Sequence, residues 1–330
     1  MTNTDSRQPL MRISHLTKEF KLKSKRFGQK PQILHALSDV SLDVYEGETL
    51  GIIGESGCGK STLGRTIIQL HKATSGTVEY QSKNIFDLKG AELKNIKKDI
   101  QMVFQDPFSS LDPRNTCEDI IAEPIKVHNI ISDPKKRQER VLSLMREVGL
   151  DVQHMNRYPH EFSGGQRQRI NVARALALNP KIIVCDEPVS ALDVSIQAQV
   201  LNLFNRLQKQ HNLTYIFISH DLGVIKHISD RIAIMYLGRV VELCEAGQIY
   251  ANPLHPYTRA LLSAIPPESP FEKKERIVLK GEIPSPIGEQ IGCPLAGRCP
   301  NCMERCTREI PTLRDVGDGH QVACFLHHND

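Results

Sequence analysis

The sequence predicts an α/β fold with a mostly parallel sheet, and three apolar runs carry this prediction. Residues 48–53 form a strand-like run that leads through a glycine-rich turn into a helical pattern beginning at Lys60. Residues 182–185 and 213–218 are apolar enough for strands that are covered on both faces. Polar residues follow both later runs, at the sheet edge where α/β proteins place ligand-binding groups.

The turn after the first run has the G-x-x-x-x-G-K-S pattern of a phosphate-binding loop. Its glycines let backbone N–H groups wrap phosphates, and the helix N-terminus adds its positive dipole end. Lys60 is predicted to reach the β- and γ-phosphates and Ser61 to offer its hydroxyl to Mg²⁺. A chance match is disfavoured by the strand–turn–helix context. The predicted nucleotide-binding residues are Gly54, Glu55, Ser56, Gly57, Cys58, Gly59, Lys60, Ser61 and Thr62.

Three polar residues follow the two later strands. Asp186 is assigned to the magnesium shell through water, and Glu187 to orienting or deprotonating the attacking water. His220 is assigned to a γ-phosphate contact that also steadies Glu187 and the water. The alternatives are an acidic pair at a sheet edge and a histidine that only satisfies its own hydrogen bonds.

A second anion site is predicted where a short polar turn opens a helix. Its residues are Ser163, Gly164, Gly165 and Gln166. This turn cannot reach the first loop within one compact domain. We therefore expect two such chains to close face to face on ATP.

The region between these motifs predicts an amphipathic helix. Asp133 and Pro134 give an N-cap and an early proline. Apolar residues then recur at helical spacing until Gly149 stops the pattern, at Val141, Leu144, Met145 and Val148.

Whole-chain properties exclude several classes of protein. The 330 residues suit one large domain, or one domain with a small appendage. A formal charge of +4 without a long basic arm argues against a primary role in binding nucleic acid. Residues 1–7 lack a signal peptide's apolar core, and no apolar run approaches the roughly twenty residues that span a bilayer. We expect a peripheral protein at the cytoplasmic face of the membrane.

The order of these motifs resembles the ATP-binding cassette (ABC) ATPases over most of residues 10–265. The resemblance implies a P-loop NTPase nucleotide-binding domain over residues 1–265, with a mixed-sheet core and a helical subdomain over about 107–170. It implies that Gln105 touches Mg²⁺ and the attacking water, and that the turn at Ser163 is the signature that binds ATP held by the opposite subunit. It also implies a D-loop at the dimer interface, formed by Ser190, Ala191, Leu192 and Asp193.

The family also stacks an aromatic ring on adenine, and Phe20 aligns best with that position. Phe27, in the lysine-rich insert over residues 21–30, is a rival, and core packing of Phe20 is the alternative to both. The insert is predicted to be a solvated hairpin tip, with contact to acidic lipid headgroups as the weaker interpretation.

The C-terminal quarter resembles the dipeptide and oligopeptide importers, and in them the second, F-type ATP-binding subunit. After a predicted hairpin that turns at Gly238, the segments 252–262 and 281–286 carry this likeness. It implies ATP-driven peptide uptake, with a non-identical second ATPase, two transmembrane permease subunits and an extracytoplasmic peptide-binding protein as partners. Nickel, glutathione or another small solute is the runner-up cargo. A nucleic-acid-associated cassette ATPase and a regulatory subunit with a vestigial ATP site are disfavoured.

Five of the nine cysteines crowd the last forty residues, in a predicted extension over residues 266–330. Thiolates select zinc or iron–sulfur clusters, and a metal would help to fold a segment with so little apolar content. Relatives among the peptide importers carry a [4Fe–4S] pattern, and the resemblance implies the ligands Cys293, Cys299, Cys306 and Cys324. Cys302 departs from that pattern. Zinc and ordinary free thiols remain the alternatives.

Overall fold

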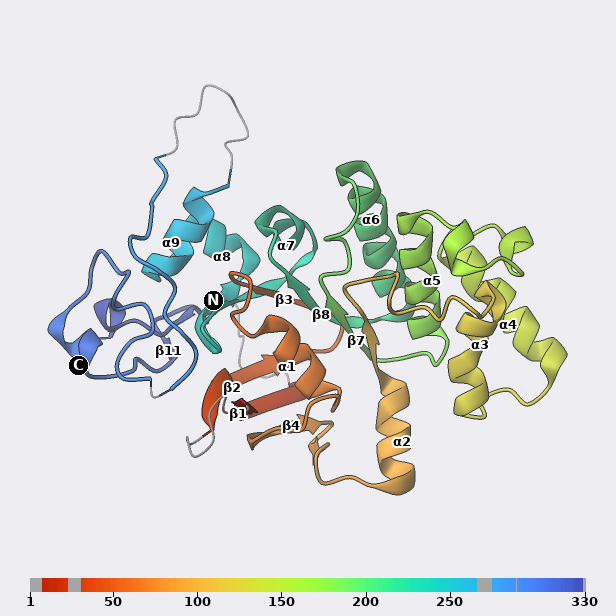
Figure 1. Ribbon diagram of the computed structural model, residues 1–330, viewed down its shortest axis with the longest axis horizontal. Helices are drawn as coiled ribbons and strands as arrows, with labels where there is room; N and C mark the ends of the chain where they lie inside the picture. Colours follow the sequence, from red (N-terminus) through yellow and green to blue (C-terminus); the bar gives the residue numbers. More distant parts are fainter. Residues whose placement is uncertain (1–7, 23–30, 266–274, 289, 329–330) are drawn as a thin grey trace. The chain divides into compact units, whose positions relative to one another are not determined.

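The strands and helices are distributed over two units (Figure 1). The structure is a computed structural model that describes residues 8–22, 31–265, 275–288 and 290–328. The first unit comprises Met1–Val44, Leu50–Lys83 and His220–Asp330, and the second comprises Tyr45–Thr49 and Asn84–Ser219. Most of the lysine-rich insert, including Phe27, lies outside the described residues.

The first unit contains an antiparallel sheet and a mixed one. In the antiparallel sheet β1 pairs with β2 on one side and with β4 on the other. The mixed set of strands has the order β11-β12-β10-β9-β3, with β3 and β9 parallel and the other pairs antiparallel. Its elements are β1 (Met11–Leu22), β2 (Gln32–Val44), β3 (Thr49–Ile53), α1 (Lys60–Ile67), β4 (Ser75–Tyr80), β5 (Lys83–Asn84), α7 (Leu222–Ile228), β9 (Arg231–Tyr236), β10 (Arg239–Glu245), α8 (Ala246–Ala251), α9 (Pro256–Ser263), η3 (Glu304–Thr307), β11 (Arg314–Asp315), β12 (Gln321–Val322) and η4 (Phe325–His327).

The predicted hairpin at Gly238 is confirmed. β9 and β10 pair antiparallel from Tyr236 and Arg239 onward. The two residues between them, Leu237 and Gly238, both have positive φ, at 43° and 77°. Two left-handed residues in a row match the right-handed twist of the flanking strands, which is why a glycine stands in this turn.

The second unit is built on three parallel strands in the order β8-β7-β6. Every residue of β7 and β8 is buried, as the two apolar runs predict for strands that are covered on both faces. Its elements are α2 (Gly90–Asp99), β6 (Ile100–Val103), α3 (Cys117–Val127), α4 (Pro134–Glu147), η1 (Val152–His154), η2 (Pro159–Glu161), α5 (Gly164–Leu176), β7 (Ile182–Asp186), α6 (Val194–His211) and β8 (Thr214–Ser219).

Helices α3, α4 and α5 of the second unit pack together (Figure 1). The predicted amphipathic helix is α4, and Asp133 caps it by accepting a hydrogen bond from the Lys135 N–H at 2.8 Å. The predicted apolar positions Val141, Leu144, Met145 and Val148 are all buried. Gly149 follows with a φ of 72°, the left-handed conformation that ends a helix.

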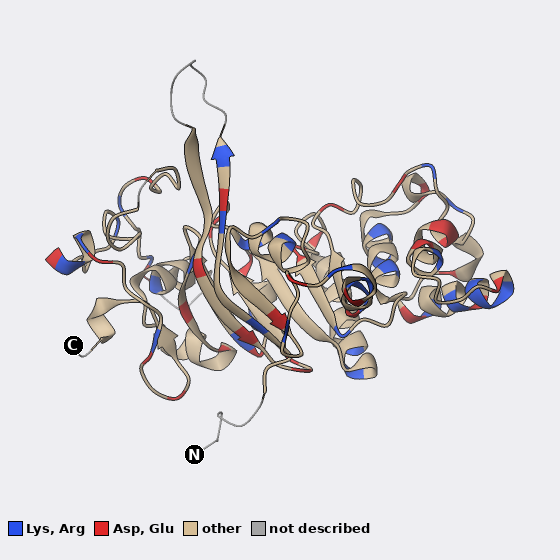
Figure 2. Ribbon diagram, turned by 90° about the horizontal axis from the view of Figure 1, so that it is seen from below, with Lys and Arg blue, Asp and Glu red and all other residues tan. Residues whose placement is uncertain are grey.

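Charged residues of both signs are interspersed along the elements of each unit (Figure 2). Acidic and basic positions therefore occur together on the described elements, as the small net charge of +4 suggests. Among the helices that the structure describes, none combines the length and the apolarity needed to cross a bilayer.

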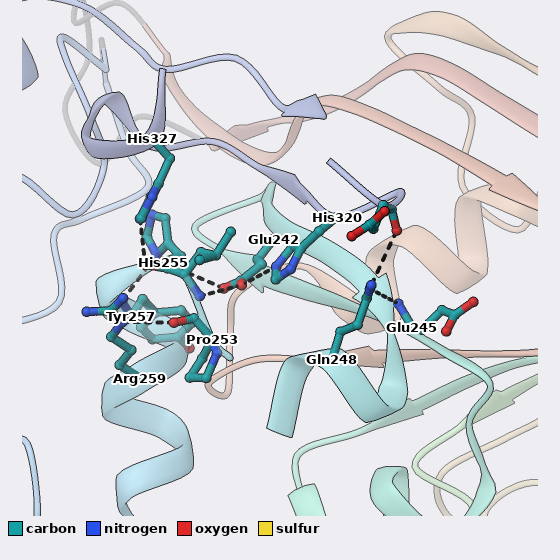
Figure 3. Close-up of polar contacts among 11 residues, drawn as sticks. Glu242, Glu245, Gln248, Pro253, His255, Tyr257, Arg259, His320 and His327 are labelled. Atoms are coloured by element: carbon teal, nitrogen blue, oxygen red, sulfur yellow. Dashed lines mark hydrogen bonds and ion pairs between the residues drawn. The ribbon is translucent and has the colours of Figure 1, made fainter. Parts of the chain in front are cut away.

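Glu242 anchors the C-terminal residues to β10 (Figure 3). Its side chain is 0% exposed, and its carboxylate accepts backbone N–H groups of Leu254 and His255 at 2.7 and 3.0 Å. His320 Nε2 lies 2.7 Å from the same carboxylate. Burial pushes the pKa of Glu242 upward, but hydrogen bonds from His320 and the two N–H groups outweigh it and hold the pKa below its ordinary value.

His255 and His327 extend this anchor. Burial lowers the pKa of His255 to about 4, so its neutral ring can accept the Tyr257 N–H at Nδ1, 3.1 Å away, and cap α9. His327 Nε2 lies 3.1 Å from the Leu254 carbonyl oxygen. Side-chain hydrogen bonds thus join the end of the chain to the strand and helix that precede it.

Glu242→Ala is expected to lower the free energy of unfolding by about 3 kcal/mol, because it leaves buried N–H donors and an imidazole without their acceptor. Urea denaturation of the full chain measures the loss. Glu282→Ala is the matched control, since Glu282 is an exposed glutamate of the C-terminal segment and its replacement should cost less than about 0.5 kcal/mol. Equal losses for the two variants would contradict the anchoring role of Glu242.

Candidate functional site

The phosphate-binding loop joins the buried strand β3 to α1. Lys60 opens that helix and is only 4% exposed. Its Nζ donates to the carbonyl oxygens of Gly54 at 2.7 Å and Glu55 at 3.1 Å. The lysine therefore holds the loop curled around its own ammonium group, and the charge that would meet a phosphate is already placed within the loop.

Two glycines of this loop stand where no side chain fits. A Cβ on Gly54 would lie 2.2 Å from the Met235 carbonyl oxygen. Gly59 has a φ of 106°, and a Cβ there would lie 2.4 Å from the Ala36 carbonyl oxygen. The loop thus needs glycine both for conformation and for its close approach to the neighbouring backbone.

Cys58 also lies within the loop and is buried. Burial raises the pKa of its thiol, and the nearby Lys60 ammonium opposes the shift without cancelling it. The side chain is therefore a neutral thiol at physiological pH and acts as a small packing group.

Side chains outside the predicted motifs contact the phosphate-binding loop and support it. The Tyr257 hydroxyl of α9 accepts the Glu55 N–H at 2.9 Å. Arg298 Nη1 lies 3.4 Å from Glu55 Oε2 and donates to the Tyr236 hydroxyl at 3.2 Å. The rings of Tyr236 and Tyr257 lie 4.6 Å apart. Sequence reasoning missed these contacts, because nothing local marks a residue that packs against a loop from so far along the chain.

Phe20 lies near the end of β1 with part of its ring exposed. The Phe20 and His71 rings are nearly perpendicular with 5.4 Å between their centroids, and the Lys18 ammonium lies 4.6 Å from the Phe20 centroid. The ring is not sealed in a core, so a planar base could still reach it.

The second unit brings Gln105 and Glu187 together. β6 and β7 run parallel, with Val103 beside Cys185, so the residues after both strands emerge at one sheet edge. There Gln105 Nε2 donates to Glu187 Oε2 at 3.0 Å. Asp186 is the last residue of β7 and is fully buried. The two predicted acidic residues therefore have different environments: Asp186 is buried at the end of the strand, and Glu187 lies just beyond it.

The Glu187 backbone is strained, with a φ of 46°. Such a conformation costs about 1 kcal/mol or more for a residue with a side chain. Its N–H donates to the Ile218 carbonyl oxygen at 2.9 Å, and its carbonyl oxygen accepts from the N–H and hydroxyl of Ser190 at 3.2 and 3.0 Å. These bonds hold the strained residue in place and link it to the predicted D-loop.

The turn at Ser163 forms the N-terminus of α5. Ser163 Oγ accepts the Gln166 N–H at 3.3 Å, and Gln166 Oε1 accepts the Ser163 N–H at 3.0 Å, which makes a capping box. A Cβ on Gly164 would lie 3.3 Å from Leu192 Cδ2, and one on Gly165 would lie 2.5 Å from Ile196 Cγ2. The glycines thus let this turn pack directly against the D-loop and the start of α6.

The segment that follows Gln105 is attached to the same helix. The Arg167 guanidinium lies 3.9 Å from the centroid of the Phe108 ring, which is 63% exposed. Arg174 Nη1 donates to the Ser110 carbonyl oxygen at 2.6 Å. A displacement of residues 106–110 would therefore be transmitted to α5 and its N-terminal turn.

His220 is exposed and directly follows β8. It begins the last segment of the first unit, which also contains Phe20 and the loop from Gly54 to Thr62. Gln105, Asp186, Glu187, the turn at Ser163 and the D-loop belong to the second. The predicted site residues are thus divided between the two units.

Four of the tail cysteines surround one small cavity. Cys293, Cys299, Cys306 and Cys324 line it, together with His255, Asn301 and apolar residues, whereas Cys302 is exposed. Burial raises the pKa of Cys293 to about 11, and the thiols of Cys306, Cys324 and Cys299 add to the shift. Over the part of the chain that the structure describes, however, no three His, Cys, Asp or Glu side chains form a group that could hold one metal ion.

Two family models match the chain. One, described as ABC transporter, matches residues 37–190, which include the phosphate-binding loop, Gln105 and the turn at Ser163. The other, described as the C-terminal region of the oligopeptide/dipeptide transporter, matches residues 241–306.

Curated relatives and solved structures are similar to the chain. The oligopeptide transport ATP-binding protein AppF of Bacillus subtilis (strain 168) is 50% identical over 98% of this chain and 98% of its own. The oligopeptide transport ATP-binding protein OppF of Escherichia coli (strain K12) is 51% identical over 98% of this chain and 97% of its own. A solved dimer of the ATP-binding cassette MJ0796, bound to ADP and Pi, is 32% identical with a TM-score of 0.63 and covers 72% of this chain and 98% of its own.

The fold and the motifs are therefore those of an ABC ATPase, with a mixed sheet and helices around a P-loop. The match to the second family model, and the identity of about 50% to curated relatives over nearly the full chain, identify the subfamily within the ABC ATPases. The chain belongs to the ABC transporter ATP-binding proteins that carry the oligopeptide/dipeptide transporter C-terminal region.

Proposed function

We propose that the chain is the ATP-hydrolysing subunit of an ABC importer that takes up dipeptides or oligopeptides. The observation that carries this proposal is the pairing of a complete set of ABC motifs with a C-terminal region similar to that of peptide transporters. Relatives named for oligopeptide transport, at about half identity over the whole chain, support the choice of cargo. Import of nickel, glutathione or another small solute stays the second candidate for the cargo.

In this proposal the loop from Gly54 to Thr62 binds the phosphates of ATP, and Phe20 stacks on the adenine. Lys60, already held inside the loop, exchanges its carbonyl contacts for phosphate oxygens. Ser61, Asp186 and Gln105 are the candidates for holding Mg²⁺, which neutralises charge on the phosphates when bound.

Hydrolysis is assigned to Glu187, with Gln105 and His220 as its helpers. Glu187 is held in a strained conformation and accepts a hydrogen bond from Gln105, so its carboxylate is pre-positioned to orient or deprotonate a water. His220 is assigned to the γ-phosphate. Pre-positioning matters because phosphoryl transfer is catalysed mainly by placement and electrostatics.

The turn Ser163–Gln166 is assigned to ATP held by a second ATPase, with the D-loop beside it at the interface. Its direct packing against Leu192 supports a joint role for the two segments. We propose a non-identical homologous ATPase as partner, together with two transmembrane permease subunits and an extracytoplasmic peptide-binding protein. Residues 106–110 and the helical subdomain over about 107–170 are the proposed contact with the permease.

We further propose that residues 266–330 form an extension to a cassette of residues 1–265 and hold a [4Fe–4S] cluster. The four predicted cysteines supply soft donors around one cavity, while Cys302 lies outside it. A single zinc would draw four sulfurs to within about 3.8 Å of one another, given Zn–S bonds of about 2.3 Å. The structure shows no group of side chains among its described residues that could hold one metal ion, so the choice of a cluster over zinc rests on the cysteine spacing shared with peptide importers.

Lys60→Ala is expected to abolish ATP binding, and Glu187→Gln to bind ATP but accumulate a closed dimer with hydrolysis reduced by about a hundredfold or more. ATPase assays of the assembled complex, with size-exclusion chromatography in ATP, measure both. Hydrolysis at the wild-type rate by Glu187→Gln would contradict the role of Glu187.

Affinity isolation from native membranes tests the transporter itself. We expect the tagged chain to bring with it a second ATPase and two proteins with several membrane spans, and the associated binding protein to carry a peptide. Recovery of the chain with nucleic acid or ribosomes would contradict the importer, and nickel or glutathione in the binding protein would replace the peptide as cargo.

Anaerobic purification of the full chain is expected to give a brown protein with about four iron and four sulfide per chain. Cys306→Ser should lose most of the iron because Cys306 lines the cavity, whereas Cys302→Ser should keep it. A colourless sample with stoichiometric zinc would contradict the cluster, and equal loss of iron in both variants would contradict the ligand set.

A further inference from the structure

The phosphate-binding loop contains an acidic residue, Glu55, next to its first glycine. Its backbone is part of the binding machinery, since its carbonyl oxygen accepts from Lys60 and its N–H donates to Tyr257. Its side chain is only 30% exposed. A partly buried negative charge beside a site for a polyanion opposes binding unless another group neutralises it.

Arg298 is the cation next to that carboxylate. Its Nη1 lies 3.4 Å from Glu55 Oε2 and 3.2 Å from the Tyr236 hydroxyl, and the side chain is 10% exposed. Tyr236 ends β9 and packs on Tyr257, the residue that binds the Glu55 N–H. The guanidinium therefore contacts Glu55 itself and one of the two tyrosines that support the loop.

The tail fixes Arg298 through a tight turn. The N–H of Ala296 donates to the Cys293 carbonyl oxygen at 2.9 Å, and the N–H groups of Arg298 and Cys299 both donate to the Leu295 carbonyl oxygen at 2.8 Å. Leu295 is buried at 2% exposure. The turn that carries two of the cavity's cysteines thus also presents Arg298 to the loop.

We propose that Arg298 is a positioning residue of the ATP site, which acts by neutralising and holding Glu55. This role rests on the proposed ATPase function and adds to it a contribution from the cysteine-bearing tail. Without the guanidinium, the Glu55 carboxylate repels the phosphates of ATP and is free to pull the loop out of its conformation. With it, the loop presents Lys60 and its N–H groups with their positive field undiminished.

The dependence of ATP affinity on the Glu55 charge distinguishes this role of Arg298 from a role in folding. If Arg298 acts through the Glu55 charge, Arg298→Met weakens ATP binding by about three- to tenfold near physiological ionic strength. Replacing Glu55 by Gln removes the charge that Arg298 neutralises. In that background we expect Arg298→Met to weaken ATP binding by at most about a third of the factor seen with Glu55 present. An arginine that only folds the tail would cost the same in both backgrounds.

The test is a double-mutant cycle on the full chain with the variants Arg298→Met, Glu55→Gln and both together. The dissociation constant is measured with a fluorescent ATP analogue at low and at high salt, after thermal melting has established that each variant is folded. Arg308→Met is the matched control, because Arg308 pairs with Glu304 on the surface of the same tail. It should bind ATP as the unsubstituted chain does.

The expected result is a loss in Arg298→Met that shrinks at high salt and in the Glu55→Gln background. Unchanged affinity in Arg298→Met, or an equal loss in both backgrounds, overturns the proposal while the ATPase function stands. Failure of the unsubstituted chain to bind ATP overturns both. If Arg298→Met does not fold, Arg298→Lys replaces it in the cycle, with a smaller loss expected that must also shrink in the Glu55→Gln background.

Discussion

The nucleotide site depends on the hydrogen bonds between the Lys60 ammonium and the carbonyl oxygens of Gly54 and Glu55. They curl the loop around a buried cation before any phosphate arrives. The loop can take that shape only because Gly54 and Gly59 carry no Cβ against the backbone at Met235 and Ala36. The loop therefore loses its conformational entropy when the protein folds, so less entropy is lost when a ligand binds.

The same principle governs the second unit, where a strained carboxylate is held by its neighbours. Glu187 takes its positive φ because Ile218 and Ser190 fix its backbone, and Gln105 fixes its carboxylate. The segment after Gln105 in turn rests on α5 through Phe108 and Arg167. Movement of that segment thus has two consequences within one unit, since it changes both the partner of Glu187 and the support of the turn at Ser163.

The sequence predicts the parts of this molecule whose chemistry is local. The strands, the capped helix α4, the turn at Gly238 and the capping box at Ser163 are specified by residues within a few positions of one another. The brace on the loop is not local, because Tyr257 and Arg298 reach Glu55 across most of the chain. No periodicity or motif spacing marks such contacts, since their partners are chosen by the fold.

Residues 275–328 of the tail depend on polar contacts and on the cysteine-lined cavity for their stability. Among its described residues few side chains are buried, chiefly Leu295, Cys306, Val322 and Ala323, so hydrophobic burial alone gives it little stability. The buried Glu242 supplies part of the missing stability through its contact with His320. Arg298 can hold Glu55 only as firmly as the tail itself is held. The organisation of the phosphate-binding loop therefore depends on the anchor at Glu242 and on the turn between Cys293 and Cys299.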